Sequence, residues 1–336
     1  MQKTEIMKKL KVIVSGGGTG GHIFPAIAIA KSFEKKVENI ELLFVGAKDR
    51  MEMQKIPEAG YKIKGLWITG IQRSFSSKNL LFPLKLISSL IRSKNILRKF
   101  KPDLVIGTGG FASGPLLYVA SKKGIPSIIQ EQNSYPGITN KLLAKNVYKI
   151  CVAYDNMERF FPKEKLIFTG NPIRKEILEF SRKRVEGQNF FRLNNRRVTV
   201  LVVGGSLGAK TINESINNNL KEFKKEQLNL IWQTGVFFES QAEESVRSIN
   251  ERGIHSYKFI KQMDLAYAAA DIIVSRAGAI AISELCYVGK PVILVPSPNV
   301  AEDHQTQNAQ SLVNKNSALM VKDKDSSRKL VNEIKN

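Results

Sequence analysis

A glycine-rich segment near the N-terminus has the residue types that bind phosphate. Gly16 to Gly21 comprises five glycines and one threonine, and His22 follows directly. A strand-like run precedes this segment and the helix-like PAIAIAKSF follows it, so backbone N–H groups converge with the positive end of a helix dipole. Gly16, Gly18 and Gly21 match G-x-G-x-x-G, but the next strand-like run has no carboxylate until Asp49, so the match to dinucleotide-binding proteins is partial.

Two more glycine clusters follow strand-like runs. Residues 107–115 follow DLVI, and residues 204–208 follow TVLVV. A single cluster of this kind often serves only as a tight strand-to-helix connection. Because the carboxyl ends of parallel strands meet at one edge of a sheet, we expect the loops at 16–21 and 107–115 to lie side by side and to bind an anionic ligand there.

His22 has two open interpretations. A helix N-terminus favours the neutral form of a histidine, which could take a proton from an attacking hydroxyl. Equally, the ring could bind the phosphate or cap the helix. His255 and His304 complete no metal-binding pattern with His22, and we expect no divalent-metal site.

Polar residues in the second half suit a nucleotide sugar. Glu284 lies about one turn into a helix-like segment that begins after SRAG, where it could bind both hydroxyls of a ribose or simply complement the helix dipole. The stretch EDHQTQNA at 302–309 is dense in hydrogen-bonding groups after the run PVILVP. It is suited to a sugar or a base, or it is a polar helix start.

The elements that position these residues alternate between short apolar runs and longer amphipathic segments. Val-, Ile- and Leu-rich runs that end in Gly, Asn, Ser or Pro predict buried parallel strands. Two such series predict an α/β chain with two doubly wound sheets, and we place their boundary near Gly170 to Pro172. Both halves open with a strand and a glycine loop, a weak internal repeat.

Composition limits the class of protein. The chain has 336 residues, 43% of them hydrophobic, and a formal charge of +22, which predicts an anionic partner: a phosphate-bearing substrate, nucleic acid or acidic lipid. No apolar run approaches the about 20 residues of a membrane span, and no signal-peptide cleavage site follows the N-terminus, so we expect a cytoplasmic chain.

Cys151 and Cys286 are expected to be buried thiols that neither pair nor bind zinc.

The segment from Lys78 to Lys101 combines many apolar residues with seven basic residues and no acidic one. This pattern is typical of a helix that lies on an anionic bilayer. It is equally compatible with a helix that packs on the core and has a basic rim.

Seven motifs, in order along almost the whole chain, resemble those of the MurG glycosyltransferases, which add N-acetylglucosamine to the membrane-bound precursor of peptidoglycan. They are GGGTGGHIFPAIAIA, GTGGFASGP, EQNSYPGITNKLLAK, TGNPIR, VVGGSLGA, SRAGAIAISEL and DHQTQNA. The resemblance implies a glycosyltransferase of the B type, with two Rossmann-like domains that face a cleft. Residues 1–171 would bind the acceptor and the membrane, and residues 172–336 would bind UDP-GlcNAc.

The resemblance also implies site residues, position by position. For UDP-GlcNAc they are Thr19, Gly20, Gly21, Asn133, Arg174, Ser206, Ile260, Ala279, Ile280, Ala281, Ile282, Ser283, Glu284 and Gln305. For the acceptor pyrophosphate they are Gly17, Gly18, Gly109, Gly110 and Ser113. Within the donor set, Asn133 would contact the sugar, Arg174 and Ser206 the phosphates, Ile260 the uracil, Glu284 the ribose and Gln305 the sugar hydroxyls.

The implied reaction is an inverting displacement at the anomeric carbon by the C4 hydroxyl of N-acetylmuramic acid on undecaprenyl-pyrophosphate. His22 would be the general base, and no metal or cofactor would be needed. The implied location is the cytoplasmic face of the inner membrane, where Lys78 to Lys101 would contact the anionic leaflet and other cell-wall synthesis proteins could bind. We expect no nucleic-acid partner.

The chain departs from the family pattern at two places. Ala281 stands where the family usually has threonine, which removes a hydroxyl near the donor. The sequence ends at Asn336, soon after DHQTQNA, whereas relatives continue through further helices, so we expect weaker interdomain rigidity.

Two other functions are compatible with part of the sequence. A nicotinamide-dependent oxidoreductase would use the loop at 16–21, but the missing acidic residue and the EQN and TGNPIR motifs disfavour it. A basic nucleic-acid-binding protein would bind DNA or RNA with steep salt dependence, but there is no stacking platform or recognition-helix motif.

Overall fold

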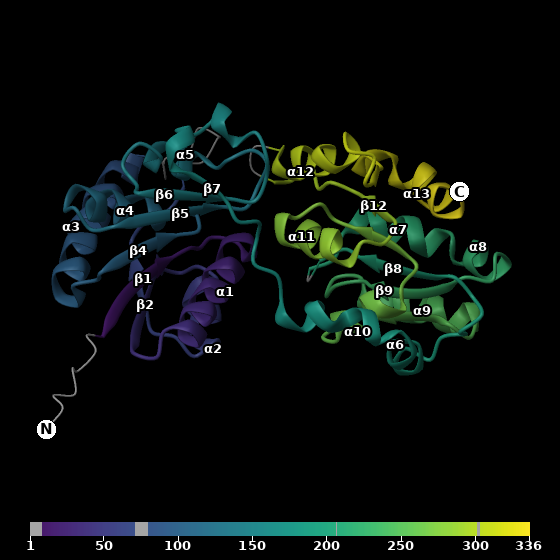
Figure 1. Ribbon diagram of the computed structural model, residues 1–336. Coiled ribbons are helices and arrows are strands. Elements are labelled where there is room, and N and C mark those ends of the chain that lie inside the picture. Colours follow the sequence, from purple (N-terminus) through teal and green to yellow (C-terminus); the bar gives the residue numbers. More distant parts are fainter. Residues whose placement is uncertain (1–8, 71–79, 206, 301–302) are drawn as a thin grey trace, which may run out of the picture. The chain divides into compact units, whose positions relative to one another are not determined.

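The computed structural model describes the chain except for residues 1–8, 71–79, 206 and 301–302 (Figure 1). The chain divides into two compact units, Met1–Pro172 and Ile173–Asn336. Each unit is a parallel sheet covered by helices, as the sequence predicts, and is described by itself below.

The first unit contains a seven-stranded parallel sheet in the order β3-β2-β1-β4-β5-β6-β7. Its strands are β1 (Leu10–Ser15), β2 (Ile40–Ala47), β3 (Ile63–Leu66), β4 (Leu104–Gly107), β5 (Ser127–Glu131), β6 (Lys149–Val152) and β7 (Leu166–Phe168). The helices between them are α1 (Gly20–Lys36), α2 (Glu52–Glu58), α3 (Phe82–Phe100), α4 (Ser113–Lys122) and α5 (Ile138–Leu143). The strand order reverses between β1 and β4, which pair in register. In open α/β sheets this switch point is where ligands bind.

The second unit repeats the architecture with a six-stranded sheet in the order β10-β9-β8-β11-β12-β13. Its strands are β8 (Thr199–Val203), β9 (Asn229–Gln233), β10 (Ile254–Tyr257), β11 (Ile272–Ser275), β12 (Val292–Leu294) and β13 (Leu319–Met320). Its α-helices are α6 (Arg184–Phe190), α7 (Lys210–Asn218), α8 (Leu220–Lys225), α9 (Glu239–Ile249), α10 (Met263–Ala269), α11 (Ala279–Val288), α12 (His304–Val313) and α13 (Ser326–Lys335). Here the switch point lies between β8 and β11.

The buried strands explain why the apolar runs form these sheets. Val12, Ile13 and Val14 of β1 are fully buried, as are Val200 and Leu201 of β8, because helices cover both faces of each sheet. Continuous apolar runs are therefore required, and the runs predicted from the sequence are all strands. Strands β3, β10 and β13 were not predicted: polar residues interrupt the short strands β3 and β10, and β13 has only two residues.

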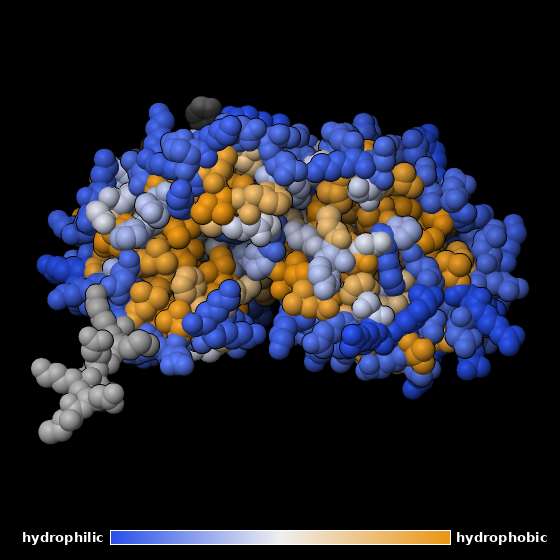
Figure 2. All heavy atoms as spheres, viewed as in Figure 1, coloured by the Kyte–Doolittle hydropathy of each residue, from blue (hydrophilic) through white to orange (hydrophobic). Residues whose placement is uncertain are grey.

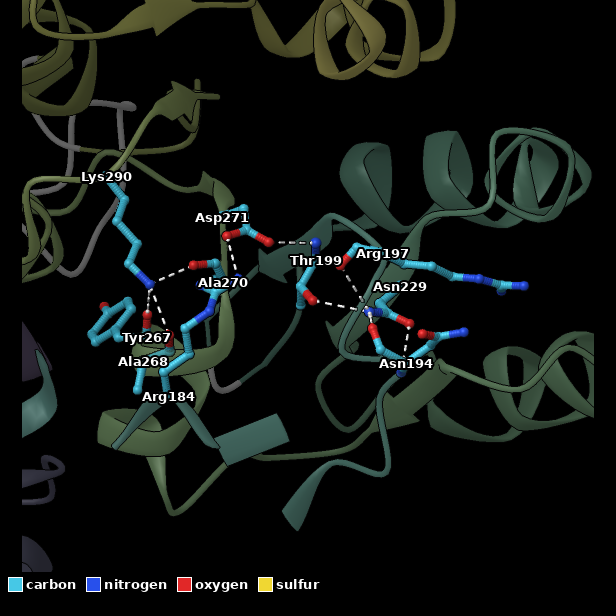
Figure 3. Close-up of polar contacts among 10 residues, drawn as sticks. All are labelled: Arg184, Asn194, Arg197, Thr199, Asn229, Tyr267, Ala268, Ala270, Asp271 and Lys290. Carbon is cyan, nitrogen blue, oxygen red and sulfur yellow. Dashed lines mark hydrogen bonds and ion pairs between the residues drawn. The ribbon is translucent and has the colours of Figure 1, made fainter. Parts of the chain in front are cut away.

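At the amino edge of the second sheet, polar side chains join strands to loops (Figure 3). The Asp271 carboxylate accepts from the backbone N–H of Thr199 at 2.9 Å and pairs with Arg184 at 2.8 Å. The Lys290 ammonium donates to the carbonyls of Tyr267, at 2.6 Å, and of Ala268, at 2.9 Å. These contacts fix the end of α10, whose Tyr267 belongs to the site described below.

Helix α3 turns its apolar stripe outward. The exposed fractions of Leu84, Ile87 and Ile91 are 58%, 55% and 59%, while the buried face of the helix includes the small side chains of Ser89 and Ser93. Apolar side chains reach the surface elsewhere in both units on the face that Figure 2 shows, so exposure alone is not informative. The spacing of the α3 residues along one side of a helix distinguishes them. Among the described residues, no helix is long and apolar enough to span a membrane.

The predicted burial of the cysteines is wrong. Cys286 is exposed, because it lies on the outer face of α11, and Cys151 in β6 is half-buried. Both are free thiols. Burial raises the pKa of the half-buried Cys151 thiol, so this thiol is not activated as a nucleophile.

Candidate functional site

Two glycine loops of the first unit contact each other at its switch point. They follow β1 and β4, whose last residues, Ser15 and Gly107, are partners in the ladder. A Cβ at Gly110 would lie 2.3 Å from the carbonyl oxygen of Gly17, so only glycine allows this approach. The expected side-by-side placement of the loops is confirmed.

Hydroxyls behind the loops hold them together. The Thr108 hydroxyl donates to the carbonyl of His22 at 2.7 Å, and the Ser113 hydroxyl donates to the carbonyls of Gly109 at 2.8 Å and Ser15 at 3.0 Å. Both side chains are fully buried. The Ser113 hydroxyl therefore braces the two loops, and the role of Ser113 toward the acceptor pyrophosphate stays a prediction.

His22 lies in the first turn of α1, next to the second loop. Its Nδ1 is 3.0 Å from the carbonyl oxygen of Gly17. A carbonyl oxygen only accepts, so Nδ1 carries the hydrogen and the lone pair of the neutral ring is on Nε2. A Cβ at Gly109 would lie 2.8 Å from the ring. The Thr19 hydroxyl oxygen lies farther from Nδ1, at 3.4 Å, so the shorter contact with Gly17 favours the Nδ1–H tautomer, with Nε2 as the basic nitrogen.

Glu52, at the start of α2, is a functional residue that the sequence analysis missed. Its carboxylate is fully buried and accepts the backbone N–H groups of Gly18 and Ala47, both at 2.9 Å. The N–H of Gly18 is thereby used within the protein.

Another buried carboxylate organises the EQN motif after β5. Glu131 accepts from the backbone N–H of Asn133 at 3.0 Å, from its side-chain amide at 3.1 Å and from the amide of Asn140 at 2.8 Å. Gln132, which lies between Glu131 and Asn133, donates to the carbonyl of Thr108 at 2.8 Å. The loop of Asn133 is therefore tied to the second glycine loop.

In the second unit, Arg174 and Glu284 bind each other. The Arg174 Nε and Nη2 donate to the two carboxylate oxygens, each at 2.7 Å. The exposed fraction of the Glu284 side chain is 3% and that of Arg174 is 47%, so the arginine is the partner that a ligand can reach. The hydrogen bond to Glu284 raises the pKa of Arg174.

Tyr267 of α10 supports this carboxylate from behind. It is buried and its hydroxyl donates to Glu284 at 3.3 Å. Burial, together with the charge of Glu284, raises the pKa of Tyr267, so the hydroxyl stays protonated as a donor. Nothing in the sequence near Glu284 indicates this partner.

The third glycine loop follows β8 at the switch point of the second sheet. Ser206 lies outside the described residues. Gln233 of β9, another missed residue, donates to the carbonyl of Gly205 at 3.1 Å and accepts from the N–H of Ile260 at 2.9 Å. Because the N–H of Ile260 is bonded to Gln233, its carbonyl is the group assigned to uracil below.

The remaining residues predicted to bind UDP-GlcNAc lie near the starts of three helices, α11, α12 and α1. Ala279 and Ile282 are buried, whereas Ile280, Ala281 and Ser283 are half-buried. The Gln305 side-chain oxygen accepts from the N–H of Ser297 at 2.8 Å, which fixes this oxygen as an acceptor within the protein. Thr19, Gly20 and Gly21 lie at the N-terminus of α1 in the first unit.

Arg276 is a further residue whose supporting contacts the sequence did not predict. It follows β11 and donates to the carbonyls of Val295, at 3.1 Å, and Pro296, at 3.3 Å, and pairs with Asp323. Asp323 also accepts from the Thr211 hydroxyl at 2.6 Å. These contacts join the carboxyl ends of β11 and β12 to α7. Within the described part of the chain, no group of three His, Cys, Asp or Glu side chains could hold a metal ion.

Taken together, the first unit has a histidine beside two glycine loops, and the second unit has a paired arginine and carboxylate and a third glycine loop. Comparison with known proteins identifies similar chains. The model of the glycosyltransferase family 28 N-terminal domain matches residues 12–152, and that of the family 28 C-terminal domain matches residues 199–336.

Similar relatives have one name. A protein of Christiangramia forsetii is 56% identical over 312 residues, which cover 93% of this chain and 84% of the relative. One of Parabacteroides distasonis is 53% identical over 325 residues, covering 97% and 88%. Each is named UDP-N-acetylglucosamine--N-acetylmuramyl-(pentapeptide) pyrophosphoryl-undecaprenol N-acetylglucosamine transferase. Among solved structures, Acinetobacter baumannii MurG superposes with a TM-score of 0.78 at 27% identity, covering 97% of this chain and 91% of that one.

Proposed function

The chain belongs to the MurG transferases of glycosyltransferase family 28, and from this premise we propose how its residues perform the transfer. The enzyme moves N-acetylglucosamine from UDP-GlcNAc to the lipid-linked MurNAc-pentapeptide, which gives lipid II for peptidoglycan synthesis. The residue roles, the inverting mechanism and the membrane site are the parts that we propose. The observation that carries the mechanism is the contact between His22 Nδ1 and the Gly17 carbonyl, which leaves Nε2 as a base.

The second unit binds the donor. Arg174 is the half-exposed partner of the ion pair, so the diphosphate draws it away from Glu284. The Glu284 carboxylate, held by Tyr267, then accepts the two ribose hydroxyls. Ser206 and the loop after β8 contact the phosphates, the Ile260 carbonyl the uracil, and the Gln305 amide a sugar hydroxyl. The backbone and side chains of residues 279–284 line the same site.

The first unit binds the acceptor. We assign the acceptor pyrophosphate to the backbone of Gly17, Gly109 and Gly110 at the carboxyl edge of the sheet, where the absence of side chains lets the two loops pack against each other, His22 and Glu52. Gly18 shapes the loop in a left-handed conformation, with φ of 85°, and its N–H serves Glu52. Thr19, Gly20, Gly21 and Asn133 complete the donor-sugar contacts from this unit. The first unit is thus the acceptor domain and the second the donor domain.

The reaction is an inverting displacement. His22 Nε2 takes the proton from the C4 hydroxyl of MurNAc, whose oxygen forms a bond to the anomeric carbon as the bond to UDP breaks. The guanidinium of Arg174 and the N-terminus of α11 offset the charge that develops on the leaving diphosphate. These groups supply the electrostatic stabilisation that the reaction needs, and we propose that it proceeds without a metal ion or other cofactor.

Helix α3 is the membrane contact of the first unit. Its outward stripe of Leu84, Ile87 and Ile91 is flanked by the exposed cations Arg92 and Lys94. An apolar stripe beside basic side chains suits the anionic inner leaflet, where the lipid-linked acceptor lies. The enzyme is therefore a peripheral protein of the cytoplasmic face of the inner membrane, where other cell-wall synthesis proteins can bind it, and it has no nucleic-acid partner.

The direct test measures transfer of radiolabelled GlcNAc from UDP-GlcNAc to undecaprenyl-pyrophosphoryl-MurNAc-pentapeptide, with and without EDTA. We expect lipid-linked disaccharide in both samples. Product that disappears with EDTA and returns with Mg²⁺ would contradict the metal-free mechanism. No product in either sample, from protein that binds UDP-GlcNAc, would contradict the assigned acceptor.

A further inference from the structure

We propose that Glu52 is a positioning residue that orients His22 through the single peptide unit between Gly17 and Gly18. The inference deepens the proposed function, since it rests on His22 as the base. Glu52 touches neither His22 nor a substrate in this arrangement. It acts on the histidine only through the backbone amide that lies between them.

The carboxylate is built into the fold. It lies at the start of α2 with no exposed surface, and it accepts the N–H groups of Gly18, through Oε2, and of Ala47, through Oε1, both at 2.9 Å. Ala47 ends β2, the neighbour of β1 in the sheet. Glu52 therefore fixes the loop after β1 relative to the end of the adjacent strand.

The N–H that Glu52 binds and the carbonyl that His22 binds belong to one amide. The Gly17 carbonyl and the Gly18 N–H lie in the same planar peptide unit. Donation of the N–H to a carboxylate polarises the amide and strengthens its carbonyl as an acceptor. That carbonyl lies 3.0 Å from His22 Nδ1. The chain of contacts therefore runs from carboxylate to peptide to imidazole.

Its chemical effect is that of a carboxylate bound to a catalytic histidine. In such pairs the carboxylate fixes the tautomer and orientation of the ring, and it favours the cation that forms when the base takes a proton. Here the peptide unit between Gly17 and Gly18 transmits the same preference, for a hydrogen on Nδ1 and for the imidazolium cation. The expected contribution is part of the about 10²- to 10⁴-fold that a positioned general base supplies.

Local packing leaves no room for a different arrangement of these groups. A Cβ at Gly17 would lie 2.1 Å from the Glu52 carboxylate, and a Cβ at Gly46 would lie 2.5 Å from its Cγ. Both neighbours must be glycine for the carboxylate to reach the loop. If Glu52 only tied the loop to β2, the tautomer of His22 would not depend on it. The tautomer of His22 therefore distinguishes a positioning role of Glu52 from a purely structural one.

The test combines nuclear magnetic resonance and kinetics on the full chain. Histidine labelled with ¹⁵N is incorporated, and long-range ¹H–¹⁵N spectra at a pH where the ring is neutral report the tautomer of His22, assigned with His22→Gln. The variants are Glu52→Gln, which is neutral and keeps at most one acceptor contact, and Glu58→Gln as control. Glu58 lies on the same helix and bonds with Lys55 and Gln54 at the surface.

We expect the Nδ1–H tautomer in wild type and in Glu58→Gln, and a shift toward Nε2–H in Glu52→Gln. In the same variant kcat should fall at least about tenfold, while KM for UDP-GlcNAc stays within about twofold. If Glu52→Gln fails to fold by circular dichroism, Glu52→Asp is measured in its place. Its carboxylate is one methylene shorter and cannot reach both N–H groups, so the same changes are expected.

Three results would overturn the inference: the Nε2–H tautomer in wild type, an unchanged tautomer in the Glu52 variant, or unchanged kcat. A fall in kcat with an unchanged tautomer would assign Glu52 a purely structural role. The spectra need no turnover. Failure of wild type to transfer GlcNAc would therefore refute the proposed function without affecting the measured tautomers.

Discussion

At the scale of single residues, the proposed donor site requires Arg174 and Glu284 to change partner when UDP-GlcNAc binds. Their two hydrogen bonds, both at 2.7 Å, satisfy a carboxylate that is almost fully buried. In the proposed exchange, the diphosphate replaces the carboxylate as the partner of Arg174, and the ribose replaces the guanidinium on Glu284. A ligand without the diphosphate has to break the ion pair without compensation.

This exchange predicts the effect of Glu284→Gln. The amide keeps the size of the side chain but loses the charge that the ribose hydroxyls and Arg174 require. Removing a hydrogen bond to a charged group costs about 1.5–3 kcal/mol, so the Kd for UDP-GlcNAc should rise by about 10- to 100-fold in isothermal titration calorimetry. Glu244→Gln, on the exposed side of α9, is the matched control. An unchanged Kd in Glu284→Gln would remove the carboxylate from the donor site.

Sequence patterns could identify residues that approach a ligand, but not those that support them. His22, Arg174 and Glu284 belong to motifs next to strand ends, and the structure places His22 beside two glycine loops and pairs Arg174 with Glu284. Glu52, Gln233 and Tyr267 act across the fold: Glu52 bonds with Gly18, 34 residues away, and Tyr267 with Glu284, 17 residues away. A single sequence contains no local signal for such pairs, because packing creates them.

At the scale of elements, α3 separates two interpretations of Lys78 to Lys101. A helix that packed its apolar side on the core would bury Leu84, Ile87 and Ile91, yet these side chains are exposed and Ile96 and Leu97 are buried instead. Residues 78 and 79 lie outside the described part of the segment. The exposed stripe supports the proposed membrane contact.

The membrane contact predicts the behaviour of a triple variant, Leu84→Gln, Ile87→Gln and Ile91→Gln. Loss of the apolar area should reduce cosedimentation with vesicles that contain phosphatidylglycerol by at least about tenfold, since each buried aliphatic side chain contributes about 1.5–3 kcal/mol. Val185→Gln replaces an exposed apolar residue of α6 and should bind as wild type does. Equal binding of the triple variant would refute the contact.

Lys290 predicts a stability effect at the end of α10. Replacing it with methionine removes the donor that binds the carbonyls of Tyr267 and Ala268, which should cost about 1–3 kcal/mol of unfolding free energy in urea. Lys210→Met, at an exposed position, is the control. A loss no larger than that of the control would contradict this role.

The same lysine gives the stability a pH dependence. Burial disfavours its charged form and lowers the pKa of Lys290 from 10.5 to about 8. Between these values the unfolded chain binds more protons than the folded chain, so the wild-type unfolding free energy should rise with pH relative to Lys290→Met. Urea titrations at pH 7.5 and 9.5 measure the difference. A difference that stays constant or narrows would contradict the lowered pKa.

Long buried strands can be predicted from the sequence better than short strands at the edge of a sheet. Long apolar runs such as those of β1 and β8 are unambiguous, because both of their faces are buried. The two-residue β13 (Leu319–Met320) pairs only because β12 offers it an edge, which no local pattern encodes.

At the scale of the whole molecule, one architecture is used twice, and each copy places glycine loops at its switch point. The fold class followed from this repetition of strand and loop. The proposed roles of the two units did not follow from this repetition, since they depend on particular side chains: a histidine in the first unit, and an arginine with a carboxylate in the second. The charge of +22 agrees with a donor, an acceptor and a membrane surface that are all anionic.

The most direct test of these roles is the single-turnover transfer rate of His22→Ala at saturating UDP-GlcNAc, with the donor Kd measured on the same protein. We predict a rate at least about 10²-fold below wild type, because a general base is lost, and an unchanged donor Kd. A rate near that of wild type would contradict the account, since His22 would then not be the base.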